Sequence, residues 1–316
     1  MKENKKPILS ICIPTRNRWY SLQYTLKSII DQEEFKSWDV EIVISDNVST
    51  DETEFEVWKL CKKYKNIRYF RNKENIGGMP NIFKVLTLWK WEYLWLFGSD
   101  DLLSNSALNI MIKAIKTYNA RLILCSRCSI EKLNKLDNKE INNKIMNFNW
   151  FSDFSTYLWY QDNNTHHKDT YFTFMSTHCF RRESFFESYN FMLEKLKIPE
   201  DKIKLHSFSF SFIWFVWIQN SDLITIIDKP CLVWYWTNNS WNLNKKIVKD
   251  LKQEMKFLVD TYPISKNWKK IMWKIYFCWR MCLYVVPYVN WMLKIPVLKN
   301  IYWFFSKKHI KNMWIK

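Results

Sequence analysis

Short apolar runs alternate with segments of helical periodicity in the first part of the chain. The runs are typical of buried strands and occupy residues 8–14, 39–47, 66–72, 93–97 and 120–126. In the segments between them apolar residues recur every three or four positions, which predicts helices at residues 16–32, 53–64, 81–91 and 106–118. Strands separated by helices of this length predict an α/β fold, with a mostly parallel central sheet that helices cover on both faces.

The periodicity weakens in the middle of the chain. Residues 131–170 are rich in Asn and Lys with scattered aromatic residues, and we interpret them as a long excursion near the ligand site. Strand and helix patterns then return, including two strand-like runs at residues 223–230 and 231–236. A polar segment follows, so we predict a catalytic domain at residues 1–240 and a C-terminal extension at residues 241–316.

The C-terminal extension is basic and aromatic. It holds 16 Lys and Arg against 3 Asp and Glu, and so carries +13 of the net charge of +17, together with seven Trp. Residues 268–286 place Trp and aliphatic residues on one helical face and Lys and Arg opposite. Its uncharged runs are too short to span a bilayer. We expect amphipathic helices in the lipid headgroup layer; the alternative is helices packed on the main domain with solvated lysines.

Composition narrows the class of protein. With 48% hydrophobic and 18% aromatic residues and only 3 Gly, the chain is neither disordered nor collagen-like. Its first six residues are polar and its first apolar run is too short for a signal peptide, so we expect a reduced, cytoplasmic compartment. Together with the basic extension, this predicts a peripheral location on the inner face of the plasma membrane. Cys125 and Cys128 form a lone CxxC, a weak zinc signal, and we favour ordinary strand cysteines.

Two adjacent carboxylates follow the predicted strand at residues 93–97. Asp100 and Asp101 come after Gly98 and Ser99, and Asp46 similarly ends the strand at residues 39–47. Ligands of parallel α/β sheets bind at the carboxyl ends of the strands, where these side chains should meet. Carboxylate oxygens suit Mg²⁺ or Mn²⁺ and leave positions for phosphate oxygens. The alternative is a capping pair at a helix N-terminus.

Four motifs then occur in a familiar order: LSICIPTRNR, EIVISDNVSTDET, NIGGMPNIF and YLWLFGSDDLL. Together they resemble the family 2 glycosyltransferases of GT-A fold, strongly over residues 7–110 and weakly over residues 170–240. The resemblance implies a Rossmann-like nucleotide-binding sheet and inverting transfer of a sugar from a nucleotide-sugar donor. It does not cover the C-terminal extension.

The resemblance also implies roles for the acidic pair. Asp101 would be the direct ligand of a divalent cation, Mn²⁺ or Mg²⁺, and Asp100 would contact the ribose or contribute to the metal site. Ser99 replaces the first Asp of a strict DxD motif, which makes this an xDD motif.

Other motif residues would bind the nucleotide sugar. Asp46 matches the position that hydrogen-bonds the base. Asn47 replaces a second Asp, and Asp51 matches the end of the family's turn, where a helix-capping role is equally open. The loop beneath the base and the turn near the donor would comprise Pro14, Thr15, Arg16 (in place of the common Tyr), Asn75, Gly77 and Asn81.

An inverting reaction needs a base for the acceptor hydroxyl. The family's usual candidate is the Asp of an ED motif, and this chain offers Glu200 and Asp201. His206 has a spacing to the later strand closer to the one expected, in a segment that resembles abequosyltransferase-like members, and a neutral imidazole can accept a proton. We rank His206 first, then Asp201, then Glu200.

These observations predict an enzyme that transfers a sugar to a lipid-linked or cell-surface oligosaccharide in bacterial O-antigen, capsule or lipooligosaccharide synthesis. No nucleic-acid partner is expected. One alternative is a nucleotidyltransferase, although residues 14–21 supply no glycine for a phosphate loop. Another is a non-catalytic membrane- or nucleic-acid-binding protein that uses the basic extension.

Overall fold

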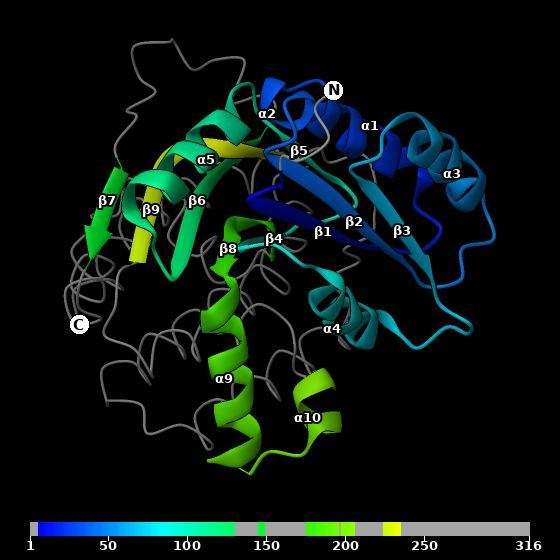
Figure 1. Cartoon of the computed structure of the whole chain (residues 1–316). Helices are drawn as coiled ribbons and strands as arrows, with labels where there is room; N and C mark the ends of the chain where they lie inside the picture. Colours follow the sequence, from blue (N-terminus) through cyan, green and yellow to red (C-terminus); the bar gives the residue numbers. More distant parts are fainter. Residues whose placement is uncertain (1–5, 130–144, 149–174, 196, 206–223, 235–316) are drawn as a thin grey trace, which may run out of the picture. The chain divides into compact units, whose positions relative to one another are not determined.

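The computed structural model describes residues 6–129, 145–148, 175–195, 197–205 and 224–234 (Figure 1). All of them belong to one compact unit, Met1–Trp236. Within this described part, no helix combines the length and apolarity needed to cross a membrane. The predicted excursion lies mostly outside the described residues, and the predicted domain boundary and amphipathic C-terminal helices lie wholly outside them, so these remain predictions.

The first half of the unit forms the parallel core of the sheet. β1 pairs with β2 on one side and with β4 on the other, and β2 pairs with β3, all in parallel. The resulting strand order is β3-β2-β1-β4. The elements are β1 (Leu9–Thr15), α1 (Trp19–Ile30), α2 (Glu33–Lys36), β2 (Val40–Asp46), α3 (Thr53–Lys63), β3 (Ile67–Arg71), α4 (Gly78–Leu88) and β4 (Tyr93–Leu96).

The second half extends the same sheet to the order β3-β2-β1-β4-β8-β6-β9-β5, with β7 also on β9. β8 is antiparallel to both neighbours, whereas β6 and β9 are parallel to each other. The predicted mostly parallel sheet is therefore confirmed. The elements are β5 (Asp101–Leu103), α5 (Ala107–Tyr118), β6 (Leu122–Ser129), β7 (Ile145–Phe148), the 3₁₀ turn η1 (Met175–Thr177), β8 (His178–Arg181), α9 (Arg182–Glu194), α10 (Glu200–Leu205) and β9 (Ile224–Trp234).

β9, β7 and α4 are among the elements that differ from the sequence prediction. The two strand-like runs after residue 222 form the single strand β9, and its Pro230 falls where the pairing with β6 shifts register. A proline has no N–H for the ladder, so a strand accommodates it at such an irregularity. Strand β7 lies inside the predicted excursion, and it pairs with β9. Helix α4 begins at Gly78, with Pro80 in the first turn, where the missing N–H costs little.

The connections between strands determine which face each helix covers. Right-handed crossovers from β1 to β2 and from β2 to β3 put α1 and α3 on one face, and the return from β3 to β4 puts α4 on the other. Figure 1 shows α1, α2, α3 and α5 above the sheet and α4, α9 and α10 below it. On the α1 face the alternating residues Leu9, Ile11 and Ile13 are fully buried with α1 residues such as Leu22. The carboxyl ends of β1 to β4 consequently share one edge of the sheet.

Candidate active site

The carboxylates of Asp100 and Asp101 both lie against Gly98 at this edge. A Cβ atom built on Gly98 would lie 2.7 Å from Asp101 Oδ2, 3.1 Å from Asp100 Oδ1 and 3.3 Å from Ser176 Oγ. The two carboxylate oxygens can therefore be no further apart than the sum of the first two distances. Ser176 also accepts a hydrogen bond from the Gly98 N–H at 2.7 Å and donates one to Asp101 Oδ2. A side chain larger than hydrogen at residue 98 would separate these groups.

Ser176 belongs to η1 and is 1% exposed. Its carbonyl oxygen accepts hydrogen bonds from Trp95 Nε1 at 2.7 Å and from Cys125 Sγ at 3.8 Å. The serine is thus held by β4 and β6 at its backbone while its hydroxyl orients Asp101. Cys125 is buried inside β6, and burial, with a further contribution from Cys231, raises the pKa of its thiol well above the usual value. Cys125 therefore behaves as a strand cysteine; the side chain of Cys128 lies outside the described set.

Asp100 pairs with a cation from another strand end. Arg18 Nη1 donates to Asp100 Oδ2 at 3.1 Å, and the two side chains are 33% and 35% exposed. Arg18 follows β1 and directly precedes α1. The charge of one carboxylate is thus compensated by an arginine of the first motif, which sequence reasoning did not single out.

The acidic pair suits a divalent cation that a substrate helps to bind. Among the described residues, no group of three or more His, Cys, Asp or Glu side chains gathers to enclose a metal ion. Two converging carboxylates offer hard oxygen ligands and leave coordination positions for phosphate oxygens, an arrangement that Mg²⁺ commonly uses. The residues present fit such a cation, and Asp100 and Asp101 would be its protein ligands.

Asp46 lies fully buried at the end of β2. Its Oδ1 accepts hydrogen bonds from the Ser49 N–H at 2.9 Å and the Ser49 hydroxyl at 2.5 Å, and its Oδ2 accepts one from the Tyr69 hydroxyl at 2.5 Å. Arg71 Nε lies 4.0 Å from Oδ2. Burial and the bond to Asp46 raise the pKa of Tyr69, so its phenol stays protonated. In this state Asp46 organises the turn after β2, and its predicted contact with the base remains a prediction.

The turn after β2 is fastened to the loop after β1. Asn17, in the left-handed region with φ 51°, donates its N–H to Ser49 Oγ at 2.9 Å and accepts the Thr50 N–H at 2.7 Å. Asp51 accepts the N–H groups of Trp19 at 3.0 Å and Thr53 at 3.1 Å. Burial raises the pKa of Asp51, but the adjacent Thr53 and the backbone hydrogen bonds from Trp19 and Thr53 outweigh it and lower the pKa. Asp51 therefore caps the starts of α1 and α3.

A neutral amide network joins β2 to the turn before α4. Asn47 donates to Asn75 Oδ1 at 2.7 Å and to the Gly77 carbonyl at 3.1 Å, and accepts from Asn72 at 3.0 Å. Asn81 accepts from the same Asn72 amide at 3.0 Å and donates to the Ser45 carbonyl at 2.9 Å. Gly77 has φ 90° and ψ 163°, a conformation that favours glycine. The predicted residues Asn47, Asn75, Gly77 and Asn81 are thus brought together, with Asn72 as their unpredicted centre.

The remaining donor-site predictions sit at the same edge. Thr15 ends β1 opposite Asp46, and its hydroxyl is buried with no hydrogen-bond partner among the described residues. Pro14 is half-buried, Arg16 is exposed, and Ser99 is 8% exposed beside the acidic pair. The structure therefore places all ten predicted donor-site residues at the carboxyl ends of β1, β2 and β4, in the turn before α4 or in the first turn of α4. Their contacts with a donor remain predictions.

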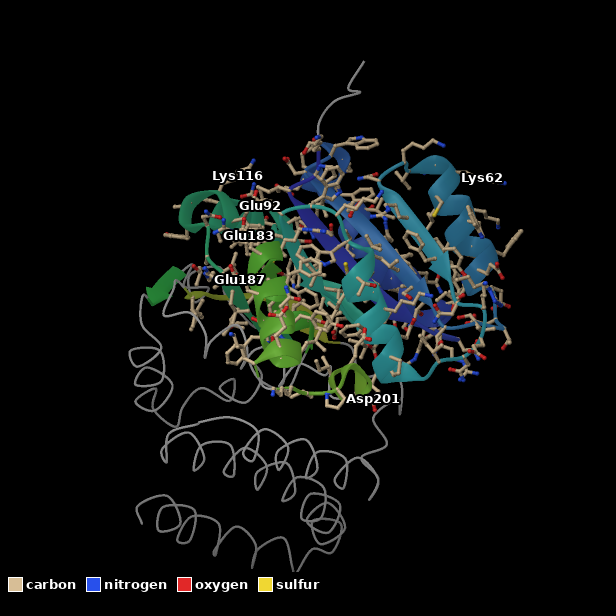
Figure 2. All side chains as sticks on the ribbon, turned by 60° about the horizontal axis from the view of Figure 1, so that its bottom comes forward. Lys62, Glu92, Lys116, Glu183, Glu187 and Asp201 are labelled. Atoms are coloured by element: carbon tan, nitrogen blue, oxygen red, sulfur yellow. The ribbon has the colours of Figure 1, made fainter. Side chains whose placement is uncertain are left out.

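The candidates for the base are described only in part. Glu200 and Asp201 are exposed at the start of α10. This helix packs against α4, and Figure 2 labels Asp201 there. Glu200 accepts a hydrogen bond from the Tyr189 hydroxyl at 2.9 Å. Burial and this bond raise the pKa of Tyr189 to about 12. His206 lies outside the described residues, so the ranking of the three stays a prediction.

A mostly parallel sheet with a carboxylate pair at the carboxyl ends of its central strands defines an α/β protein with a candidate ligand site at that edge. The comparison with family models agrees: the model described as Glycosyl transferase family 2 matches residues 10–189. This match spans more than half of the chain, which therefore belongs to glycosyl transferase family 2.

Bacterial relatives match over part of their length. The chain is 42% identical over 125 residues to abequosyltransferase RfbV of Salmonella typhimurium, covering 38% of this chain and 36% of that protein. It is 35% identical over 140 residues to the GalNAc(5)-diNAcBac-PP-undecaprenol beta-1,3-glucosyltransferase of Campylobacter jejuni, covering 44% and 43%. The chain thus spans less than half the length of these two curated relatives.

Solved structures share the fold at low sequence identity. Residues 1–349 of S. aureus TarS give a TM-score of 0.58 at 15% identity, covering 92% of this chain and 75% of that one. The mannosyltransferase PcManGT of Pyrobaculum calidifontis, solved with GDP-Man and Mn²⁺, gives 0.52 at 15% identity, covering 89% and 70%. At this identity the likeness establishes the fold alone, and it confirms the expected GT-A architecture.

Proposed function

We propose that this chain is an inverting glycosyltransferase that moves a sugar from a nucleotide-sugar donor to a lipid-linked or cell-surface oligosaccharide in bacterial glycan biosynthesis. The observation that carries the proposal is the convergence of Asp100 and Asp101 over Gly98, at the edge where β1 and β2 also end. Family membership and the names of the two bacterial relatives support the same reading.

The chain's own residues would divide the work at this edge. Asp101, held by the Ser176 hydroxyl, and Asp100 would hold a divalent cation, Mn²⁺ or Mg²⁺. Such a cation supplies charge neutralisation for a departing diphosphate. Asp46, Thr15 and the loop after β1 would bind the nucleoside.

In the transfer step the acceptor oxygen bonds to the anomeric carbon while the bond from that carbon to the diphosphate breaks. The hydroxyl proton passes to a base, for which His206 is the first candidate, followed by Asp201 and Glu200. The acceptor class is supported by the name of the Campylobacter relative, which specifies an undecaprenol-linked glycan. The basic, Trp-rich residues 241–316 would hold the enzyme at the cytoplasmic face of the membrane, near such an acceptor.

A thermal-shift screen of UDP-, GDP-, dTDP- and CDP-sugars, each with and without Mn²⁺, tests this function. A ligand that binds the folded state raises the unfolding temperature by mass action. We expect one donor class to stabilise the chain in the presence of Mn²⁺, and Asp101→Asn to abolish that shift. Asp31→Asn is the matched control, because Asp31 is an exposed carboxylate paired with Lys27 at the far end of α1. No stabilisation by any donor would contradict the proposed function.

A further inference from the structure

We propose that Arg18 is a mobile charge that neutralises Asp100 while the donor is absent and turns to the diphosphate when metal and donor bind. This inference rests on the proposed function and deepens it, by adding a donor-contacting residue of the first motif. The inference is drawn from the ion pair between Arg18 Nη1 and Asp100 Oδ2, which lie 3.1 Å apart although the two residues are 82 positions apart in the sequence. The other oxygen, Asp100 Oδ1, faces Gly98 together with Asp101.

The backbone around Arg18 is held by several hydrogen bonds, whereas its side chain is held through the ion pair with Asp100. The preceding Asn17 is bonded to Ser49 and Thr50, and the following Trp19 N–H is held by Asp51. The Arg18 carbonyl accepts the N–H groups of Ser21 at 3.0 Å and Leu22 at 2.8 Å. The Arg18 side chain, by contrast, is 33% exposed and has Asp100 as its one carboxylate partner among the described residues, so it can turn without disturbing the loop.

The location of this arginine is unfavourable for the helix itself. It directly precedes α1, whose first turn contains no acidic residue. The N-terminus of a helix carries partial positive charge, so a cation there opposes the helix dipole and an anion is favoured. The carboxylate of Asp51 already accepts the Trp19 N–H at this N-terminus, so the Arg18 guanidinium, on the same edge as the carboxylate pair, is the group that can receive a phosphate. Arginine binds such groups through two parallel N–H donors.

The ion pair and a metal ion compete for Asp100. Removing the guanidinium removes this competing partner of Asp100, so the protein should bind Mn²⁺ more tightly in the absence of nucleotide. Partly exposed ion pairs are weak, and the expected gain in affinity is about two- to fivefold. Nucleoside diphosphate should instead bind more weakly, by roughly tenfold to a hundredfold, because a charge-assisted hydrogen bond to phosphate is lost.

The test uses the full chain and its Arg18→Gln variant. Mn²⁺ binding alone is followed by electron paramagnetic resonance, and binding of UDP, GDP, dTDP and CDP at saturating Mn²⁺ by calorimetry. The matched control is Lys27→Gln, which removes an ion-paired cation from the other end of α1. Arg18→Lys keeps the charge, so it should restore wild-type Mn²⁺ affinity and recover diphosphate binding in part. Thermal unfolding of each variant checks folding.

Opposite shifts in Arg18→Gln, tighter for Mn²⁺ and weaker for the nucleoside diphosphate, with neither shift in Lys27→Gln, support the proposal. An unchanged or weaker Mn²⁺ affinity overturns it, and so does an unchanged diphosphate affinity. If the wild-type chain binds neither Mn²⁺ nor any of the four nucleotides, the proposed function itself falls, and the role of Arg18 falls with it.

Discussion

Replacing Gly98 by alanine tests the packing on which the candidate metal site depends. The added Cβ would lie 2.7 Å from Asp101 Oδ2, so the carboxylate has to retreat by more than half an ångström to reach the 3.4 Å of ordinary contact. Asp101 is not free to do so at no cost, because the Ser176 hydroxyl holds the same oxygen. The substitution therefore forces either a strained contact or the loss of this hydrogen bond.

The strained contact and the lost hydrogen bond have similar costs in the free energy of unfolding. Overpacking a buried site costs about 1–3 kcal/mol, and losing a hydrogen bond to a charged group costs about 1.5–3 kcal/mol. The free energy of unfolding should thus fall by about 1–3 kcal/mol, which lowers the unfolding temperature by roughly 2–10 °C in a domain of this size. Displacing Asp101 should also weaken Mn²⁺ binding about tenfold or more, as other losses of ligand positioning do.

Differential scanning fluorimetry and paramagnetic resonance titration of Mn²⁺ measure both effects. Gly78→Ala is the control, because a Cβ there meets nothing within 4 Å and the residue opens α4. Alanine in a helix is favoured over glycine by about 0.5–1 kcal/mol, so this variant should be unchanged or slightly stabilised. Wild-type stability together with wild-type Mn²⁺ affinity in Gly98→Ala would refute the described convergence of the carboxylates.

Three further predictions follow from the site. Ser176→Ala should weaken Mn²⁺ binding roughly tenfold, whereas Ser184→Ala, which removes a buried hydroxyl without a hydrogen-bond partner in the described part of the chain, should not change it in the same titration. Gly77→Ala should lower the free energy of unfolding by about 1–3 kcal/mol in chemical denaturation, because φ 90° is strained for alanine. Asp51→Ala should cost about 1 kcal/mol at pH 7 as a lost helix cap. The pKa of Asp51 is lower in the folded state than in the unfolded state. The stabilisation by Asp51 is therefore complete above the unfolded-state pKa of ~3.9 and is lost as the pH falls through the lower folded-state pKa. The melting curves of the wild type and Asp51→Ala should accordingly converge in acid.

The local patterns of the sequence predict the core of the sheet because each strand and helix carries its own periodicity. The strand of residues 39–47 was expected from its apolar run, and β2 occupies Val40–Asp46 with every residue buried. The sequence pattern predicts two runs, residues 223–230 and 231–236, whereas the pairing with β6 continues past Pro230 with a shifted register and makes one strand, β9. Tertiary pairing of this kind overrides local turn propensity.

In the candidate site too, residues within local motifs could be predicted from the sequence, whereas partners distant in sequence could not. Asp46 and Asp101 could be predicted because they end or follow strands within recognisable motifs. Their partners could not, because Ser176 lies 75 residues from Asp101, and Arg18 lies 82 residues from Asp100. Asn72 was also missed, since nothing in the motif pattern indicates that its amide links Asn47 to Asn81. The motifs therefore identify the edge that holds the candidate site, and the fold supplies the groups that orient its side chains.

The central claim is that the acidic pair at the carboxyl ends of the strands binds a nucleotide sugar through a divalent cation. Isothermal titration of the donor found by thermal shift, into the full chain with Mn²⁺ or with EDTA and into Asp101→Asn with Mn²⁺, tests it most directly. We expect the donor to bind the wild-type chain with Mn²⁺, and to bind at least about tenfold more weakly in the other two titrations, because each of them removes the metal or one of its ligands. Equal affinity in all three titrations would contradict it.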